Sequence, residues 1–249
     1  MCIAAVAWRA HPRWQLVVAA NRDELHTRPA LPLARWADAP GIIAGRDTEA
    51  GGTWLGVNEA LARLVLVTNR RTDEPPRADA PSRGALVRAL LDGADPLAVP
   101  LAGYNPCNLL VAGADGLVAL ESHPDARRRL LPPGVHGVSN GALDAVWPKT
   151  RALVETLRGW LDGEADPEAL FAVLADRTPR PARPGEPGAE AMFNSVFIEG
   201  PVYGTRCSTL VMVDAKGQAR MRERRFSPTG EAVGESAVDF SWPLFNPAS

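Results

Sequence analysis

The second residue of the chain, Cys2, has the clearest capacity for nucleophilic chemistry. Initiator methionine is normally removed when the residue after it is small, and loss of Met1 would leave Cys2 with a free α-amino group. Such a residue holds a nucleophile and a base together, because an α-amine has a pKa of about 7.7–8.0, close to working pH. The competing interpretation of Cys2 is a small buried hydrophobic residue.

A run of four polar residues, Asn21-Arg22-Asp23-Glu24, directly follows an apolar segment. These side chains cannot all be packed in an apolar core, because buried charges need partners. In a hairpin the end of the second strand lies beside the start of the first, so we expect Arg22 and Asp23 near Cys2. A guanidinium would lower the pKa of the thiol, and a carboxylate would hold the ammonium group. A surface Asx turn is the alternative interpretation of this spacing.

Two other patterns resemble catalytic or metal sites. Gly137-Val138-Ser139-Asn140-Gly141 matches the GxSxG nucleophile elbow, but the triad of that elbow requires a later histidine and the last one is His136. The histidines show no metal-ligand spacing, so a zinc site is not expected. Cys2, His136 and Asn140 stand in the order of a thiol protease, and we keep that arrangement as a minor alternative.

The composition of the 249 residues, 46% hydrophobic and 22% charged with a net charge of −2, is typical of one globular domain spanning 1–249. The longest apolar runs fall short of the ~18 residues of a membrane helix, which excludes an integral membrane protein. The first apolar stretch is too short for a signal peptide, so we expect a cytoplasmic protein. The near-neutral charge argues against nucleic acid as a partner. Three widely spaced cysteines exclude a disulfide framework.

The elements that must position these residues are mostly short strands. Strands are expected at 3–8, 14–21, 41–45, 53–58, 62–69, 108–112, 117–122, 195–199, 209–214 and 218–226. Helices are expected from Ser82 to Gly93, from Pro148 to Leu161 and from Pro167 to Asp176. The Pro-, Gly- and Arg-rich stretch 178–190 is predicted to be a flexible loop. This order lacks strand–helix alternation, so it favours an α+β fold with mainly antiparallel sheets covered by helices.

Several short blocks together resemble the NRDE family, which includes the transport and Golgi organisation protein 2 of animals. In chain order the blocks are Met1-Cys2, Asn21-Arg22-Asp23-Glu24, Gly51-Gly52-Thr53-Trp54-Leu55-Gly56, Thr68-Asn69-Arg70, Ser82-Arg83-Gly84, Tyr104-Asn105-Pro106, Val138-Ser139-Asn140 and Tyr203-Gly204-Thr205-Arg206. They run over nearly the whole chain. Cys207 stands where the last block is expected to have serine.

The resemblance implies an N-terminal-nucleophile-hydrolase-like fold, a four-layer αββα sandwich with two mainly antiparallel sheets inside. A more distant similarity to cysteine amidases implies that Cys2 attacks, Asp23 anchors its amine, Arg22 and Arg206 tune the thiolate, and Asn140 donates to the oxyanion. Unlike in those amidases, Arg22 and Asp23 are adjacent here, and adjacent strand residues point to opposite faces.

Two functions are compatible with this resemblance. The first is hydrolysis of a non-peptide C–N amide bond, with no cofactor required. The second is a non-catalytic carrier, either a haem chaperone or a carrier of acyl-CoA or lipid, which uses the same pocket. Without a CxxCH motif, haem would be a non-covalent ligand. In either case we expect four residues to bind the small-molecule ligand: Asn21, Trp54, Asn69 and Trp147. The oligomeric state is left open.

Overall fold

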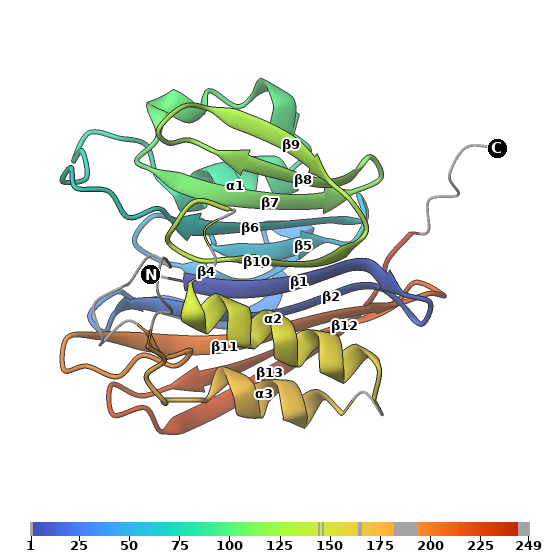
Figure 1. Cartoon of the computed structure of the whole chain (residues 1–249). Helices are drawn as coiled ribbons and strands as arrows, with labels where there is room; N and C mark the ends of the chain where they lie inside the picture. The colour runs from blue at the N-terminus through green and yellow to red at the C-terminus, as the bar shows by residue number, and fades with distance from the viewer. Residues whose placement is uncertain (1, 144, 146, 164–165, 182–193, 244–249) are drawn as a thin grey trace.

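The computed structural model describes residues 2–143, 145, 147–163, 166–181 and 194–243, and their strands form two antiparallel sheets (Figure 1). Sheet A has six strands in the order β10-β1-β2-β11-β12-β13. Its strands are β1 (Cys2–His11), β2 (Trp14–Leu25), β10 (Gly134–Val138), β11 (Tyr203–Asp214), β12 (Gln218–Phe226) and β13 (Ala232–Ser241). The N-terminal hairpin therefore lies between a strand from the middle of the chain and one from its C-terminal third.

Sheet B has seven strands that follow one another in space as in the sequence, from β3 to β9. They are β3 (Ala30–Trp36), β4 (Ala39–Asp47), β5 (Leu55–Asn58), β6 (Arg63–Asn69), β7 (Cys107–Gly113), β8 (Gly116–Glu121) and β9 (Arg127–Leu131). The sheet is thus a continuous meander. It is interrupted only between β6 and β7, where the chain leaves to form a helix and two 3-10 turns, Pro96–Ala98 and Leu101–Gly103.

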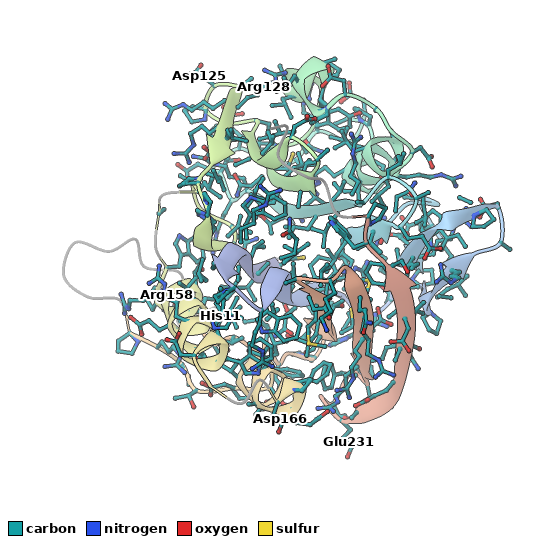
Figure 2. The ribbon with its side chains drawn as sticks, turned by 90° about the vertical axis from the view of Figure 1, so that its right-hand side faces the viewer. His11, Asp125, Arg128, Arg158, Asp166 and Glu231 are labelled. Atoms are coloured by element: carbon teal, nitrogen blue, oxygen red, sulfur yellow. The ribbon has the colours of Figure 1, made fainter. Side chains whose placement is uncertain are left out.

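Three helices in the described residues cover the outer faces of the two sheets (Figure 1). Helices α2 (Pro148–Leu161) and α3 (Pro167–Leu174) pack on sheet A, and α1 (Arg83–Leu91) packs on sheet B. A separate apolar core fills the space between the sheets. The side chains in Figure 2 fill these layers, with Asp125 and Arg128 at one end of the molecule and Asp166 and Glu231 at the other. The α+β sandwich that the sequence predicts, with helices outside and sheets inside, is confirmed.

Successive side chains of β1 and β2 point to opposite faces of sheet A and therefore pack in different apolar cores. Val6 and Val18 lie between the sheets, whereas Ala5 and Ala19 face α2 and α3. Because the side-chain period of a strand is two, Cys2 and Arg22 belong to the face between the sheets. The residues on either side of Arg22 belong to the face that the helices cover.

Most predicted elements are found, and local signals explain where they begin. Ser82 accepts a hydrogen bond from the Ala85 N–H and caps α1, and Pro148 occupies the first turn of α2. Gly116, at the hairpin between β7 and β8, has a φ of 120° that favours glycine. No described helix is long and apolar enough to cross a membrane.

The predicted strand at 195–199 is wrong. There the main chain bends, and its hydrogen bonds go to Asp176 and Thr205 instead of a sheet ladder. Strands β3, β9, β10 and β13 were not predicted. All four lie at sheet edges, and in β3, β9 and β13 exposed side chains hide the alternation that is typical of a strand. In the predicted loop 178–190, residues 178–181 have no regular structure, and the rest lies outside the described residues.

Candidate functional site

A cavity of about 530 Å³ lies where β1 begins, between the ends of the two sheets. Sheet A contributes Cys2, Arg22 and Arg206 to its lining, and sheet B contributes Asn69. The segment that leads into α1 forms a further part of the wall. A cavity of this size is typical of a small-molecule site, for which about 300–1,000 Å³ is usual.

The Cys2 side chain lines this cavity and is 7% exposed. Arg22 stands directly opposite Cys2 on β2, and Cys207 stands directly opposite Arg22 on β11. The three residues thus form a row across adjacent strands. Burial raises the pKa of the Cys2 thiol, while the Arg22 guanidinium acts in the opposite direction. The thiol therefore depends on its neighbours to become a thiolate.

Asp23 lies beside Cys2 but is held from the other face of sheet A. Its Oδ1 accepts a hydrogen bond of 2.7 Å from Thr205 Oγ1, and its carbonyl accepts one of 2.7 Å from Tyr203 Oη. Its main-chain N–H donates to the Cys2 thiol. Burial raises the pKa of the Asp23 carboxyl, although the charge of Lys149 lowers it. One residue thus contacts the thiol through its backbone and keeps its carboxyl in the protein interior.

Asn140 follows β10, the strand on the other side of β1. The neighbouring Ser139 Oγ donates to the Cys2 carbonyl at 3.0 Å, which holds the start of β1 in place. Asn140 is fully buried and is not among the residues that line the cavity. Its Nδ2 donates to the Asn69 carbonyl at 2.8 Å and so joins the two sheets. Because an amide nitrogen has a second hydrogen, donation to an oxyanion stays a prediction.

Arg206 lines the cavity, and its Nη1 donates hydrogen bonds to main-chain carbonyls at the end of β2 and in the loop that follows. It donates to the carbonyls of Leu25 and His26 at 3.0 and 2.8 Å. A main-chain irregularity between Thr205 and Cys207 marks this point of β11. The guanidinium therefore fixes the rim of the cavity, and its predicted effect on the thiolate stays a prediction.

Comparison with known proteins identifies the family. A family model described as Transport and Golgi organisation 2 matches residues 1–228. The chain belongs to this family. The Bos taurus homologue of transport and Golgi organization protein 2 is 31% identical over 258 residues, covering 90% of this chain and 92% of that protein. The Homo sapiens homologue is 30% identical over 262 residues with the same coverage, and the Drosophila melanogaster protein is 28% identical over 271 residues, covering 93% and 95%.

A solved structure matches the fold. The Caenorhabditis elegans N-acylethanolamine-hydrolyzing acid amidase ortholog aligns with a TM-score of 0.52 and 12% identity, covering 84% of this chain and 92% of that chain. At this identity the likeness shows the fold alone. It confirms for this member of the Transport and Golgi organisation 2 family the predicted N-terminal-nucleophile-hydrolase-like fold.

Lys149 is a residue of the site that sequence reasoning missed. It is fully buried at the start of α2, and among the described residues its Nζ has no hydrogen-bond partner. Its charge acts on Asp23 and on Cys2, and burial lowers the pKa of its own ammonium group. One signal was present: Lys149 lies four and eight residues before Leu153 and Leu157, on the apolar face of the helix.

The four residues predicted to bind ligand divide into two pairs. Trp54 and Asn69 line the cavity. Trp147 is buried outside it, with its ring 5.9 Å from Lys149 Nζ. Asn21 is fully buried on the helix-covered face, where its Nδ2 donates to the carbonyls of Leu174 and Val196. Neither Asn21 nor Trp147 is among the residues that line the cavity, and their contact with a ligand stays a prediction.

The thiol-protease alternative is wrong in this family member. His136 pairs with Val6, which is four residues along β1 from Cys2. At about 3.3 Å per residue, the two residues are roughly 13 Å apart along the strand. His136 Nε2 instead lies 2.8 Å from the Pro132 carbonyl. Among the described residues, no group of three or more His, Cys, Asp and Glu side chains is placed to hold a metal ion.

Proposed function

We propose that this chain is a cysteine amidohydrolase that cleaves non-peptide C–N amide bonds, with Cys2 as its N-terminal nucleophile. One observation carries the proposal: Cys2 is the first residue of β1, its thiol lines a cavity of small-molecule size, and Arg22 and Asp23 lie beside it. An amidase whose nucleophile also provides the base needs this combination at the start of a strand.

The proposed reaction begins after loss of Met1. The α-amine of Cys2 takes the thiol proton as sulfur attacks the acyl carbon of the amide, and a tetrahedral oxyanion forms. The amine then gives that proton to the leaving nitrogen, the C–N bond breaks, and a thioester remains. Water, deprotonated by the same amine, attacks the thioester and releases the carboxylic acid. The amine returns the proton to the sulfur, so the site is restored.

Arg22 and Asp23 support different atoms of Cys2 in this scheme. Arg22 lies on the cavity face and favours the thiolate. Asp23 and Lys149 lie towards the helices, where the carboxylate holds the amine. Because Lys149 provides a positive charge near Asp23, the carboxylate does not require a protonated α-amine as its only counter-charge. The free amine is then available as a base near neutral pH. Because adjacent strand residues point to opposite faces, Arg22 can act on the thiolate while Asp23 holds the α-amine.

Turnover by matched variants tests this proposal. The wild type, Cys2→Ala and Cys107→Ala are compared on a panel of N-acyl amides that includes N-acylethanolamines. Loss of the nucleophile is expected to lower turnover by at least about 10⁴-fold while ligand binding persists. Cys107 lies outside the cavity, so its variant is expected to remain within about two-fold of the wild type. Equal turnover by Cys2→Ala and the wild type would overturn the proposal.

The second candidate is a carrier that binds its ligand without chemistry, and the raised pKa of the buried Cys2 thiol favours it. Acyl-CoA and haem are the ligands that the family resemblance implies. For haem the iron ligand would have to be a cysteine thiolate, because Cys2 and Cys207 line the cavity and none of the four histidines does. A wild-type protein that binds acyl ligands but cleaves no amide across the panel would favour the carrier.

A further inference from the structure

We infer that the ligand of this cavity carries an anionic group, a carboxylate or a phosphate, which Arg83 receives beside Cys2. The inference rests on the proposed function for the place of the reacting bond, at the Cys2 sulfur. It adds the chemical class of the ligand, and it follows from how the arginines of the cavity are partnered.

Charged side chains line the cavity unevenly. Seven arginines and five acidic residues contribute atoms to its lining. Even with all five carboxyls ionised, the arginines outnumber the acidic residues of the lining by two. The lining therefore has an excess of positive charge, which favours an anionic ligand.

Most of these arginines already have carboxylate partners. Arg28 Nε lies 2.6 Å from Asp47, and Arg46 Nη1 lies 2.7 Å from Asp38. Arg22 Nη2 lies 3.7 Å from Asp47 and 3.8 Å from Glu24. Arg225 Nη1 lies 3.5 Å from Glu223. The charges of these four arginines are largely offset within the protein.

Three lining arginines, Arg77, Arg83 and Arg206, have no carboxylate within ion-pair distance among the described residues. Arg206 is held by the loop carbonyls described above, and the exposed Arg77 donates to the Gly103 carbonyl at 2.8 Å. Within the part of the chain that the structure describes, Arg83 makes a single hydrogen bond, from Nη1 to the Pro106 carbonyl at 3.2 Å. Its Nε and Nη2 keep their N–H groups for a ligand, and such a planar fork matches the oxygens of a carboxylate or phosphate.

The position of Arg83 is fixed by close backbone packing. It is the first residue of α1, and the Thr53 N–H donates to the carbonyl of the next residue, Gly84, at 3.3 Å. A Cβ on Gly52 would lie 2.3 Å from that Gly84 carbonyl, so only glycine permits this approach. This packing fixes the backbone at Arg83, and the hydrogen bond to Pro106 orients the half-buried guanidinium. The start of the helix adds a favourable field for an anion.

Arg83 is close enough to Cys2 for the charges of the two groups to interact. Arg83 and Cys2 also line the same cavity, so an anion bound by Arg83 shares that cavity with the reacting sulfur. The matching substrate is an N-acyl compound with a carboxylate or phosphate near its amide bond, not a neutral amide.

The alkylation of Cys2 tests this inference without any amidase activity. Iodoacetate and iodoacetamide deliver the same carbon to sulfur, but only iodoacetate is anionic. We expect Arg83→Gln to lower the ratio of their rates at Cys2, read by peptide mapping, about 10-fold relative to the wild type. The matched control is Arg88→Gln, on the same helix but paired with Asp38 outside the cavity, and it is expected to keep the ratio within two-fold.

An unchanged ratio in folded Arg83→Gln would overturn the inference, and thermal melting checks folding. Arg83→Lys keeps the charge without the fork, so an intermediate ratio is expected. Decanoate and decyl phosphate separate the two anions: protection of wild-type Cys2 by one or both, lost in Arg83→Gln, supports the inference, and protection by neither contradicts it. If the ratio falls but no amide is cleaved, the anion site stands and the proposed hydrolase fails.

Discussion

The two faces of sheet A at the start of β1 differ sharply in their environments. The cavity side consists of Cys2, Arg22 and Cys207, which line the cavity. The guanidinium of Arg22 lies near the Asp47 carboxylate, which also pairs with Arg28. The helix side, formed by Asn21, Asp23 and Lys149, is buried under α2 and α3. Burial shifts the pKa of Asp23 upward and that of Lys149 downward. In the proposed reaction, the cavity face binds the ligand and attacks it, while the helix face controls the protonation of the α-amine.

The largest effect is expected from Asp23→Asn on the helix side. The substitution keeps the shape of the side chain and an oxygen for Thr205, but it removes the charge proposed to hold the α-amine. Turnover is expected to fall about 10²–10⁴-fold, as for loss of general-base function. Steady-state kinetics on the best substrate measure it. Because the cavity side is unchanged, the ratio of the iodoacetate and iodoacetamide alkylation rates at Cys2 should stay within two-fold of the wild type. A large drop in that ratio would show that Asp23 also acts on the cavity side.

Lys149→Met is expected to stabilise the fold. Burial lowers the pKa of Lys149, so above its folded pKa the folded chain binds this proton less than the unfolded chain does. Wild-type stability from this group therefore increases with pH until about 10.5, the ordinary lysine value. The lowered pKa means that burial of the charged ammonium group costs more than its attraction to Asp23 returns, and a pKa difference of one is worth about 1.4 kcal/mol. Urea unfolding should show a gain of about 2 kcal/mol at pH 7.

The pH dependence makes the Lys149 prediction specific. The advantage of Lys149→Met over the wild type should shrink as the pH increases from 7 to 10, because the wild type then loses its unfavourable buried charge. Lys216→Met, at an exposed turn, provides the control and should show no such trend. A variant less stable than the wild type at pH 7 would show that Lys149 is well compensated in the folded protein.

Arg22→Gln tests the cavity side with a smaller effect. The guanidinium lowers the pKa of the Cys2 thiol, so its loss should reduce the thiolate fraction and slow alkylation by iodoacetamide about 10-fold at pH 7. Stopped alkylation with peptide mapping measures the rate at each cysteine. The rate at Cys107, which is buried on sheet B, should not change. An unaltered rate at Cys2 would mean that Arg22 acts only on its carboxylate partners.

The smallest effects are expected from two tryptophans. Trp54 lines the cavity, so Trp54→Phe should raise KM about three- to ten-fold through lost apolar contact. Trp147 lies outside the cavity, so Trp147→Phe should change KM by less than two-fold. A reversed order would place the ligand against the helix side.

Local patterns made most of this fold predictable. The hairpins, the capped α1 and the proline-led α2 follow from turn and cap residues that act within a few positions. Hairpin geometry was enough to predict that Arg22 and Asp23 lie near Cys2. The polar edge strand β9, rich in arginine, has no alternating pattern and was missed for that reason.

The parts of the site that sequence could not predict depend on long-range pairing. Asn21 has the same side-chain parity as Val17 and Ala19, but its face was unknown until α3 was placed over it. Lys149 is not part of any sequence motif. Its role in the site depends on its interaction with the Asp23 carboxyl, which is far away in the sequence. The availability of Arg83 depends on which carboxylates lie near it, and only the folded chain shows that none of the described ones is within ion-pair distance.

The most direct test of the central claim is a mass spectrum of the N-terminal peptide after incubation with an N-acyl substrate and rapid acid quenching. The account predicts loss of Met1 and a second species heavier by the acyl group, located on Cys2. The acyl species should be missing in Cys2→Ala. A wild-type protein that keeps Met1 on every molecule, or that turns over the substrate with acylation at another residue, would contradict the account.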